Sequence, residues 1–319
     1  MVKEMMYKSK SIIASVVVIT YNHKLFIQKA LDSVLMQKTN FDYEIVIGDD
    51  CSTDGTMEII DGYAKKYSSK IRVLKSEINL GATPNFSRTF KACRGKYIAV
   101  LEGDDYWIQD NKLQLQIDLM ESHDDFSLCF TNRNIVDENK NEIKENTIPE
   151  NLRTTLTYKS ILTGVCPPMQ TLVIRSKFLD DQFYDNLPKV YNGDIFISSF
   201  LSTKGKVGFL NLTTAVYRIN ANGVYSKENY FNRLSFKLNT YNILKNTLKK
   251  KYHVYLEKAE VVILQRMFVL LLLKGNILGH FRIAVKLLSH DIRTADYSLL
   301  RAFKLLFLKG LNPFKQVTD

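Results

Sequence analysis

The sequence lacks most of the short patterns that directly identify a metal, redox or nucleotide site. Its four cysteines are scattered and form no CxxC pair, so we expect reduced thiols rather than a disulfide framework or a zinc site. Its five histidines form no HxxxH pair and no cluster with cysteine, and we interpret them as residues that do not bind metal. Neither GxGxxG nor GxxxxGK followed by Ser or Thr occurs, which disfavours a dinucleotide-binding fold and a P-loop.

Long apolar segments are also missing. The longest uninterrupted apolar run, Met267 to Leu273, is much shorter than the about 20 residues that cross a membrane. A basic N-terminus, Met1 to Lys10, precedes the apolar residues Ile12 to Ile19 in the manner of a signal peptide. A small-residue cleavage site is lacking, however, and we interpret the apolar residues as a first strand. We therefore expect a cytoplasmic protein without a transmembrane helix.

The positive charge is concentrated at one end of the chain. Residues 1–226 contain 27 Lys and Arg against 27 Asp and Glu, whereas residues 227–319 contain 17 against 6. The net charge of +11 therefore lies in the last part of the chain, which predicts an anionic partner for that part. We predict two domains, residues 1–226 and 227–319, in a chain long enough for a full core.

Polar turns follow three predicted strands. The strands at residues 15–20, 43–48 and 97–101 end in Tyr21-Asn22-His23, Asp49-Asp50 and Glu102-Gly103-Asp104-Asp105, in that order. Helical patterns follow at about 25–37, 54–67 and 110–122. Alternating strands and helices predict an α/β fold with a mainly parallel sheet. Ligands bind outside the carboxyl ends of the strands in such sheets, so the three turns should share one cleft.

The third turn carries two adjacent carboxylates, Asp104 and Asp105. Both cannot be desolvated without a cation. A divalent metal at a strand end is well placed to hold a diphosphate. The alternative is a solvated turn, for which a Gly-Asp-Asp sequence is also suited.

Five segments in register resemble the family 2 glycosyltransferases. They are Ser15 to Asn22, Asp49 to Thr56, Asn79-Leu80-Gly81, Gly95 to Leu101 and Glu102 to Asp105. The resemblance covers roughly residues 12–225 and implies a GT-A fold, a Rossmann-like nucleotide-binding domain, followed here by a helical C-terminal region. It also implies an enzyme that moves a hexosyl or N-acetylhexosaminyl group, with inversion, from a UDP-sugar to a saccharide acceptor in surface polysaccharide biosynthesis.

The same resemblance implies roles for individual residues. The nucleotide is expected at Thr20, Tyr21, Asn22, Asp49, Asp50, Asp104 and Arg218. Asp105 and Asp104 are expected to bind Mn²⁺ or Mg²⁺, which would neutralise the departing diphosphate. Asp194 matches the catalytic base, and Asn220 stands where family members often carry a histidine.

Several of these residues also have a structural interpretation. Tyr21 could be a packed aromatic side chain, Asp49 could stabilise its own turn, and Arg218 could form an internal ion pair. Asp194 opens a helical pattern, where a carboxylate caps the helix and meets its dipole favourably. Trp107 could either stack on a sugar or pack in the core.

The sequence says less about where the acceptor binds than about where the nucleotide binds. The resemblance places it at residues 164–171, which include two prolines, and at the polar segment 137–157. Residues 137–151 are expected to form a surface loop or a hairpin.

The basic C-terminal region shows helical patterns at residues 231–251, 256–273, 280–290 and 297–309. One interpretation is a set of helices packed on the catalytic domain. The other is an amphipathic surface on the anionic inner leaflet of the cytoplasmic membrane, where the acceptor would be a lipid-linked saccharide. No recognised nucleic-acid-binding motif is present, so nucleic acid is not an expected partner.

Two rival functions differ in class from the enzyme above. One is a non-catalytic, glycosyltransferase-like module that binds nucleotide or membrane, and the substitution at Asn220 is its only support. The other is nucleotidyl transfer to a sugar phosphate, which would need a Gly-rich loop after the first strand. Residues Thr20 to Lys24 contain no glycine.

Overall fold

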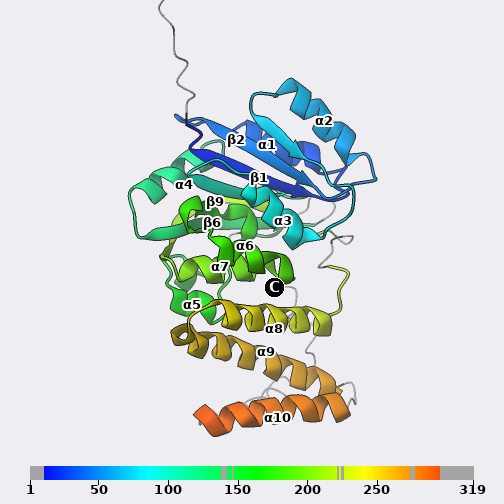
Figure 1. Cartoon of the computed structure of the whole chain (residues 1–319), viewed down its shortest axis with the longest axis vertical. Coiled ribbons are helices and arrows are strands. Elements are labelled where there is room, and N and C mark those ends of the chain that lie inside the picture. Colours follow the sequence, from blue (N-terminus) through cyan, green and yellow to red (C-terminus); the bar gives the residue numbers. More distant parts are fainter. Residues whose placement is uncertain are drawn as a thin grey trace, which may run out of the picture. The chain divides into compact units, whose positions relative to one another are not determined.

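The computed structural model describes residues 11–137, 142–145, 147–220, 223, 226–273 and 277–294 (Figure 1). The chain divides into two compact units. The first contains Met1–Ile161 and Val165–Lys227, and the second contains Leu162–Gly164 and Glu228–Asp319. All residues predicted to bind nucleotide or metal, and the predicted base, belong to the first unit.

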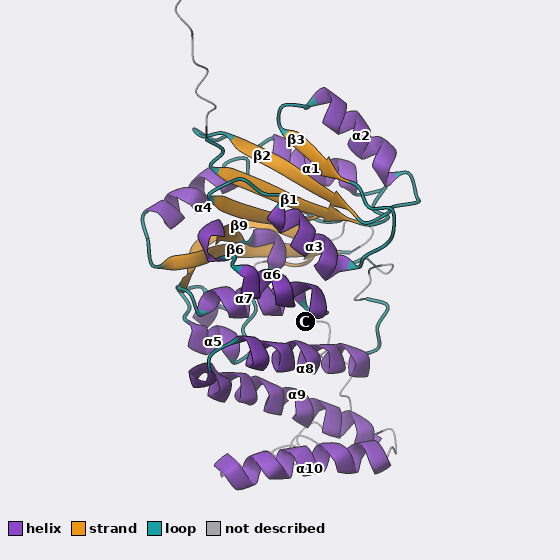
Figure 2. Cartoon of the chain, viewed as in Figure 1, coloured by secondary structure: helices purple, strands orange, loops and turns teal. Residues whose placement is uncertain are grey.

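Strands and helices alternate through the first part of the first unit (Figure 2). In chain order they are β1 Ala14–Thr20, α1 Ile27–Leu35, β2 Tyr43–Asp49, α2 Thr56–Lys66, β3 Ile71–Leu74, α3 Ala82–Lys91 and β4 Tyr97–Glu102. The remaining strands are β5 Tyr106–Trp107, β6 Phe126–Val136, β7 Glu142–Lys144, β8 Val173–Arg175 and β9 Lys206–Arg218. Helices α4 Lys112–Glu121, α5 Tyr158–Leu162, α6 Asp181–Asn186 and α7 Gly193–Ser202 lie between them, together with short 3₁₀ turns such as Met169–Thr171.

The strands form one sheet in the order β3-β2-β1-β4-β8-β6-β9-β5, with β7 added to β6. The pairs among β1 to β4 are parallel, as is β6 with β9, whereas β8 is antiparallel to its neighbours. The prediction of a mainly parallel sheet flanked by helices is therefore confirmed. The antiparallel pairing of β7 with the end of β6 agrees with the hairpin, one of the two alternatives expected for residues 137–151.

The two faces of the sheet are covered by different kinds of side chain. Strand β1 is buried along its whole length, and alternate residues of a strand point to opposite faces. On one face Val16 and Val18 pack in an aliphatic cluster with Leu31 of α1 and Ile117 of α4. A second cluster consists of stacked and edge-to-face phenylalanines from α3, α6 and α7, namely Phe86, Phe90, Phe183, Phe196 and Phe200.

The position of β1 decides where a ligand can bind. β1 lies between β2 and β4, and at its end Thr20 pairs with Asp49 of β2 while Ile19 pairs with Glu102 of β4. The chain leaves β1 toward β2 on one side and reaches β4 only after β3, so the strand order reverses here. Such a reversal opens a crevice at the carboxyl ends of the strands. The three predicted turns therefore meet at one edge of the sheet.

The second unit is helical in its described part. It contains α8 Tyr230–Thr247, α9 His253–Leu273 and α10 Ile277–Thr294. The Asn229 side chain caps α8 by accepting a hydrogen bond from the Asn232 N–H, and the Lys245 ammonium joins α8 to Glu260 of α9 at 2.6 Å. The helix predicted at residues 297–309 lies outside the described residues. No helix in the part of the chain that the structure describes is long and apolar enough to cross a membrane.

Candidate active site

The acidic turn after β4 packs tightly against the end of β1. A Cβ atom at Gly103 would lie 2.9 Å from Nδ1 of His23 and 2.9 Å from Oγ1 of Thr20, so only glycine fits between them. Thr20 is buried, and its hydroxyl has no hydrogen-bond partner among the described residues. The close approach fixes the acidic turn relative to the end of β1.

Asp105 is the buried carboxylate of this turn. Its Oδ1 accepts a hydrogen bond of 2.8 Å from the backbone N–H of Arg218, whereas its Oδ2 is buried without a partner in the described part of the chain. Burial raises the pKa of Asp105 well above its ordinary value, and the negative charges of Asp104 and Glu102 raise it further. A buried acceptor without a donor or a cation is destabilising.

The neighbouring carboxyl groups are arranged around Asp105. Burial raises the pKa of Glu102 to about 8, the charges of Asp104 and Asp194 contribute to this shift, and Arg133 opposes it. Asp104 is partly exposed, with Oδ2 lying 3.7 Å from Nε2 of His23. This histidine, for which the sequence predicted no role, therefore lies directly beside the acidic turn.

These carboxylates fit a divalent cation. The buried Oδ2 of Asp105 is an oxygen ligand in need of a partner, and Asp104 directly precedes Asp105 in the same turn. No group of three or more His, Cys, Asp or Glu side chains gathers as a metal site among the described residues. One or two carboxylates are enough for Mg²⁺, however, because substrate phosphates commonly complete its coordination.

Arg218 connects the end of β9 to the acidic turn. Its guanidinium donates to the carbonyl oxygen of Asp104 at 2.8 Å and lies over the rings of Phe26 and Tyr106. The side chain is only 3% exposed. These contacts give Arg218 a structural role, and its contact with a diphosphate stays a prediction.

The second acidic turn uses its carboxylates to hold loops. Asp49 accepts hydrogen bonds from the backbone and the hydroxyl of Ser52, which is the structural interpretation given above. The two oxygens of Asp50 accept the N–H groups of Leu80 and Gly81, each at 2.8 Å. A carboxylate oxygen has two lone pairs, so Asp50 retains capacity for a ligand.

Asn22 and Tyr21, both predicted to contact the nucleotide, have different surroundings. Asn22 adopts a left-handed conformation with φ of 56°, and its amide oxygen accepts the N–H of Thr53. Its backbone N–H donates to the Ser52 hydroxyl, so Asn22 ties the end of β1 to the end of β2. Tyr21 is 37% exposed rather than packed in the core, which leaves its ring accessible to a ligand.

Asp194 lies in the first turn of α7. Its Oδ1 accepts the N–H of Ile195, and its Oδ2 accepts a long hydrogen bond of 3.6 Å from the Cys166 thiol. The Cys166 sulfur also lies 3.9 Å from the hydroxyl of Ser198. Asp194 therefore lies beside the Cys166 thiol, and its charge contributes to the raised pKa of Glu102.

The structure adds Arg133, which the sequence did not reveal, and links it to Gln170, which belongs to the segment 164–171 expected near the acceptor. Arg133 of β6 lies with its guanidinium over the ring of Tyr217, and its Nη1 donates to Oε1 of Gln170 at 3.3 Å. Gln170 is fully buried in the 3₁₀ turn before β8. A cluster of polar residues, Asn132-Arg133-Asn134, within an otherwise apolar strand was the available signal.

Trp107 packs in the core and does not stack on a sugar. It is 2% exposed, and its indole N–H donates to the carbonyl oxygen of Gln170 at 2.9 Å. The Lys112 ammonium lies over its ring, 4.2 Å from the centroid. The ring therefore supports the turn that carries Gln170.

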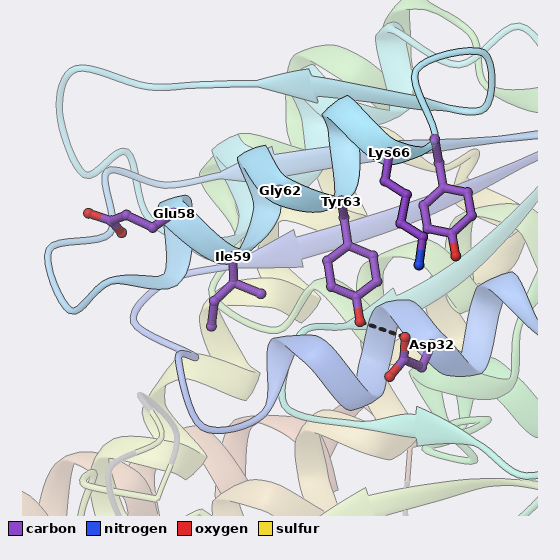
Figure 3. Close-up of a pocket in the computed structure, with 7 residues that line it drawn as sticks. Asp32, Glu58, Ile59, Gly62, Tyr63 and Lys66 are labelled. Atoms are coloured by element: carbon purple, nitrogen blue, oxygen red, sulfur yellow. Dashed lines mark hydrogen bonds between the residues drawn. The ribbon is translucent and has the colours of Figure 1, made fainter.

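A surface groove between α1 and α2 is separate from these residues. It has a volume of about 340 Å³ and is lined by Asp32, Glu58, Ile59, Gly62, Tyr63, Lys66 and Tyr67 (Figure 3). The Tyr63 hydroxyl reaches across it to Asp32 at 2.6 Å. None of these lining residues comes from the strand ends that carry the acidic turns.

Comparison with known proteins assigns the family. The sequence profile described as glycosyl transferase family 2 matches residues 15–182. The chain belongs to glycosyl transferase family 2. A family relative in Mycobacterium tuberculosis, the uncharacterized protein Rv1520, is 32% identical over 212 residues, which are 66% of this chain and 60% of the relative. The chain thus spans less than two thirds of that relative.

Two further proteins resemble parts of this family 2 chain. The putative teichuronic acid biosynthesis glycosyltransferase TuaG of Bacillus subtilis is 37% identical over 108 residues, 34% of this chain and 42% of the relative. The crystal structure of S. aureus TarS 1-349 in complex with UDP-GlcNAc superposes with a TM-score of 0.60 at 19% identity, and covers 81% of this chain and 73% of that one. The likeness to TarS concerns the fold and agrees with the expected GT-A architecture.

Proposed function

We propose that this chain is a metal-dependent, inverting glycosyltransferase that moves a hexose or an N-acetylhexosamine from a UDP-sugar to a saccharide acceptor. One observation carries the proposal. A buried carboxylate oxygen of Asp105 lacks a partner among the described residues, at the carboxyl ends of β1 and β4, where the strand order reverses. A buried acceptor in that position needs a cation or a donor from a ligand.

The nucleotide would lie across the ends of β1 and β2. The exposed ring of Tyr21 offers a stacking surface for the base, and the remaining lone pairs of Asp50 suit the N3–H donor of uracil. Cytosine carries no proton at that position, so a carboxylate there favours UDP over CDP. The UDP-GlcNAc complex of TarS, which shares the fold, is consistent with a UDP-sugar donor.

Asp105 would hold the metal through Oδ2, and Asp104 would contact it directly or through bound water. When bound, Mn²⁺ or Mg²⁺ neutralises the charge that develops on the departing diphosphate. The Arg218 N–H occupies Oδ1 of Asp105, so Oδ2 is the oxygen that would hold the cation.

Asp194 would act as the base. Its carboxylate takes the proton from the acceptor hydroxyl, and the acceptor oxygen forms a bond to the anomeric carbon. The bond between that carbon and the β-phosphate oxygen breaks, and UDP leaves with the electron pair. The attack from the side opposite UDP inverts the anomeric centre.

We extend the proposal to a lipid-linked acceptor at an anionic membrane surface. In the second unit, α10 exposes Phe281, Val285 and Leu288 at helical spacing, and Arg282 and Lys286 are also exposed. An apolar stripe beside basic residues suits the interface of an anionic bilayer. The name of TuaG, a putative teichuronic acid biosynthesis enzyme, supports a role in polysaccharide assembly.

Calorimetric titration tests the donor site. UDP, CDP and GDP would each be titrated with and without Mn²⁺, and the release of UDP from a panel of UDP-sugars would then be measured. We expect metal-dependent binding that prefers UDP, and UDP release from at least one sugar. A well-folded protein that binds none of the nucleotides would overturn the proposal. Binding without turnover of any UDP-sugar would instead favour a non-catalytic module.

A further inference from the structure

Two unpaired N–H donors lie at the same side of the candidate site. The Nε of Arg133 and the Nε2 of Gln170 are both buried and have no hydrogen-bond partner in the described part of the chain. Arg133 comes from β6 and Gln170 from the turn before β8. A buried donor left unpaired destabilises a protein, so two such groups together indicate a missing acceptor.

The geometry of the pair is fixed by its neighbours. Gln170 uses Oε1 to accept from Nη1 of Arg133, which turns its NH₂ group away from the guanidinium. The carbonyl oxygen of Gln170 is held by the Trp107 indole, and the guanidinium of Arg133 rests on the Tyr217 ring. The two donors are therefore held in place before any ligand arrives.

The pair faces the acidic turn. Gln170 is hydrogen-bonded to Trp107, which comes two residues after Asp105. Arg133 lies over the ring of Tyr217, whose neighbour Arg218 donates its backbone N–H to Asp105 at 2.8 Å. The Cys166 thiol, four residues before Gln170, lies 3.6 Å from Oδ2 of Asp194. Under the proposed function, Asp105 marks the diphosphate and Asp194 marks the acceptor, so the transferred sugar lies between them.

We propose that Arg133 and Gln170 form the subsite that reads the transferred sugar, by donating hydrogen bonds to its hydroxyl or acetamido oxygens. This inference rests on the proposed function. The subsite should prefer neutral sugars, because Asp104 and Asp194, at the two ends of the transferred sugar under the proposed function, would repel a sugar carboxylate.

The test compares the affinity for UDP with the affinity for UDP-sugars. Kd values for UDP, UDP-glucose, UDP-galactose, UDP-GlcNAc, UDP-GalNAc and UDP-glucuronate would be measured by calorimetry with Mn²⁺ for the wild type, Arg133→Lys and Gln170→Met. Arg133→Lys keeps the positive charge and removes the planar donors, whereas Gln170→Met keeps the side-chain length. Arg94→Lys, at an exposed position before β4, and Gln114→Met, on α4, are matched controls on residues outside the site.

We expect Kd for UDP to change less than about twofold in either variant, while Kd for the preferred UDP-sugar rises about tenfold or more, as loss of a buried hydrogen bond predicts. The control variants should leave both constants unchanged. UDP-glucuronate should bind the wild type more weakly than the neutral sugars.

Four outcomes would overturn the inference. Unchanged discrimination between UDP and UDP-sugar in both variants would show that the donors do not read the sugar. An equal loss of affinity for UDP and for the UDP-sugar would show that the two N–H donors contribute to nucleotide binding or to folding instead. A wild type that prefers UDP-glucuronate, or that binds UDP but none of the sugars, would also contradict it. Absence of UDP binding by the wild type would instead overturn the proposed function itself.

Discussion

The backbone N–H of Arg218 donates a 2.8 Å hydrogen bond to Oδ1 of Asp105, across 113 positions of the chain. This contact satisfies one oxygen of a buried carboxylate and leaves the other for a ligand. It also joins the last residue of β9 to the turn after β4. The half-satisfied carboxylate leads to the first prediction.

Asp105→Asn should abolish metal-dependent UDP binding without unfolding the protein. The amide can still accept the Arg218 N–H through its oxygen but carries no charge for the cation. We expect UDP affinity in Mn²⁺ to fall at least about 100-fold, an effect typical of a lost metal ligand, with an unchanged or raised Tm. Calorimetry and thermal unfolding check both parts. Asp118→Asn, on the exposed side of α4, is the matched control. If Asp105→Asn still bound UDP in a Mn²⁺-dependent way, the assignment of Asp105 as a metal ligand would be wrong.

Asp194→Asn should separate catalysis from binding. The amide oxygen can still accept the Ile195 N–H, so α7 keeps its first turn, but the side chain no longer takes a proton. Turnover of the preferred UDP-sugar should fall about 10²- to 10⁴-fold, while Kd for UDP stays the same. Asp181→Asn, a carboxylate in the first turn of α6, provides the comparison. Turnover close to that of the wild type would rule out Asp194 as the base.

Alkylation of Cys166 should inactivate the enzyme. The thiol is exposed and lies 3.6 Å from Oδ2 of Asp194, so a carbamidomethyl group there would obstruct the approach of the acceptor. We expect iodoacetamide to reduce turnover by about 100-fold, since small displacements near reacting groups have effects of this size. Cys166→Ser should stay active and resist the reagent. If iodoacetamide inactivated Cys166→Ser as strongly as the wild type, the effect would come from another cysteine.

Gly103→Ala should weaken both folding and nucleotide binding. The added methyl group would meet His23 and Thr20 at 2.9 Å and force the acidic turn away from β1. We expect a loss of about 1–3 kcal/mol in the free energy of unfolding and weaker UDP binding. Gly62→Ala in α2, where a Cβ meets nothing within 4 Å, should stabilise the protein by up to about 1 kcal/mol. Denaturant unfolding of both variants measures the contrast, and a Gly103→Ala protein as stable as the wild type would contradict it.

Lys112 should make stability depend on pH in the alkaline range. Burial lowers the pKa of its ammonium from 10.5 to about 7. Between these values the unfolded chain holds one more proton than the folded protein, so the free energy of unfolding rises with pH, by up to about 1.4 kcal/mol per pH unit. Below pH 7 both states are protonated and this contribution to the slope vanishes.

The variant Lys112→Met isolates this effect. Other groups titrate equally in both proteins, so the stability difference between wild type and variant should shift in favour of the wild type as pH rises from 7 to 9. Urea unfolding at several pH values measures it. A difference that stays constant over this range would mean that Lys112 keeps its proton in the folded protein.

The sequence was sufficient for much of the fold because the strands are short, apolar and followed by polar turns. The strands at 15–20, 43–48 and 97–101 appear as β1, β2 and β4 with small changes at their ends. Helix α3 was not predicted, since its buried face includes Asn85, Ser87 and Thr89 beside two phenylalanines. Buried polar residues hide the apolar periodicity on which helix prediction depends.

The site was harder to predict than the fold. The roles of Asp50 and Arg218 depend on partners far along the chain, the N–H of Gly81 and the carbonyl of Asp104. His23 and Arg133 reach the acidic turn only because β1 and β6 bring them there. Hydrogen bonds between distant segments leave no spacing pattern in a single sequence. The residues of the acidic turn could therefore be predicted, whereas the residues that surround them in space could not.

The contact between Trp107 and Gln170 gives the protein an internal optical probe. Trp107 is the single tryptophan of the chain, and its indole N–H is bonded to the residue that we assign to sugar recognition. When excitation is selective for tryptophan rather than for the 17 tyrosines, the emission of the unlabelled protein therefore comes from one ring beside the sugar subsite. A sugar that engages Gln170 would alter the surroundings of that ring, so donor screening can be followed by fluorescence without a dye, a coupled enzyme or a known acceptor.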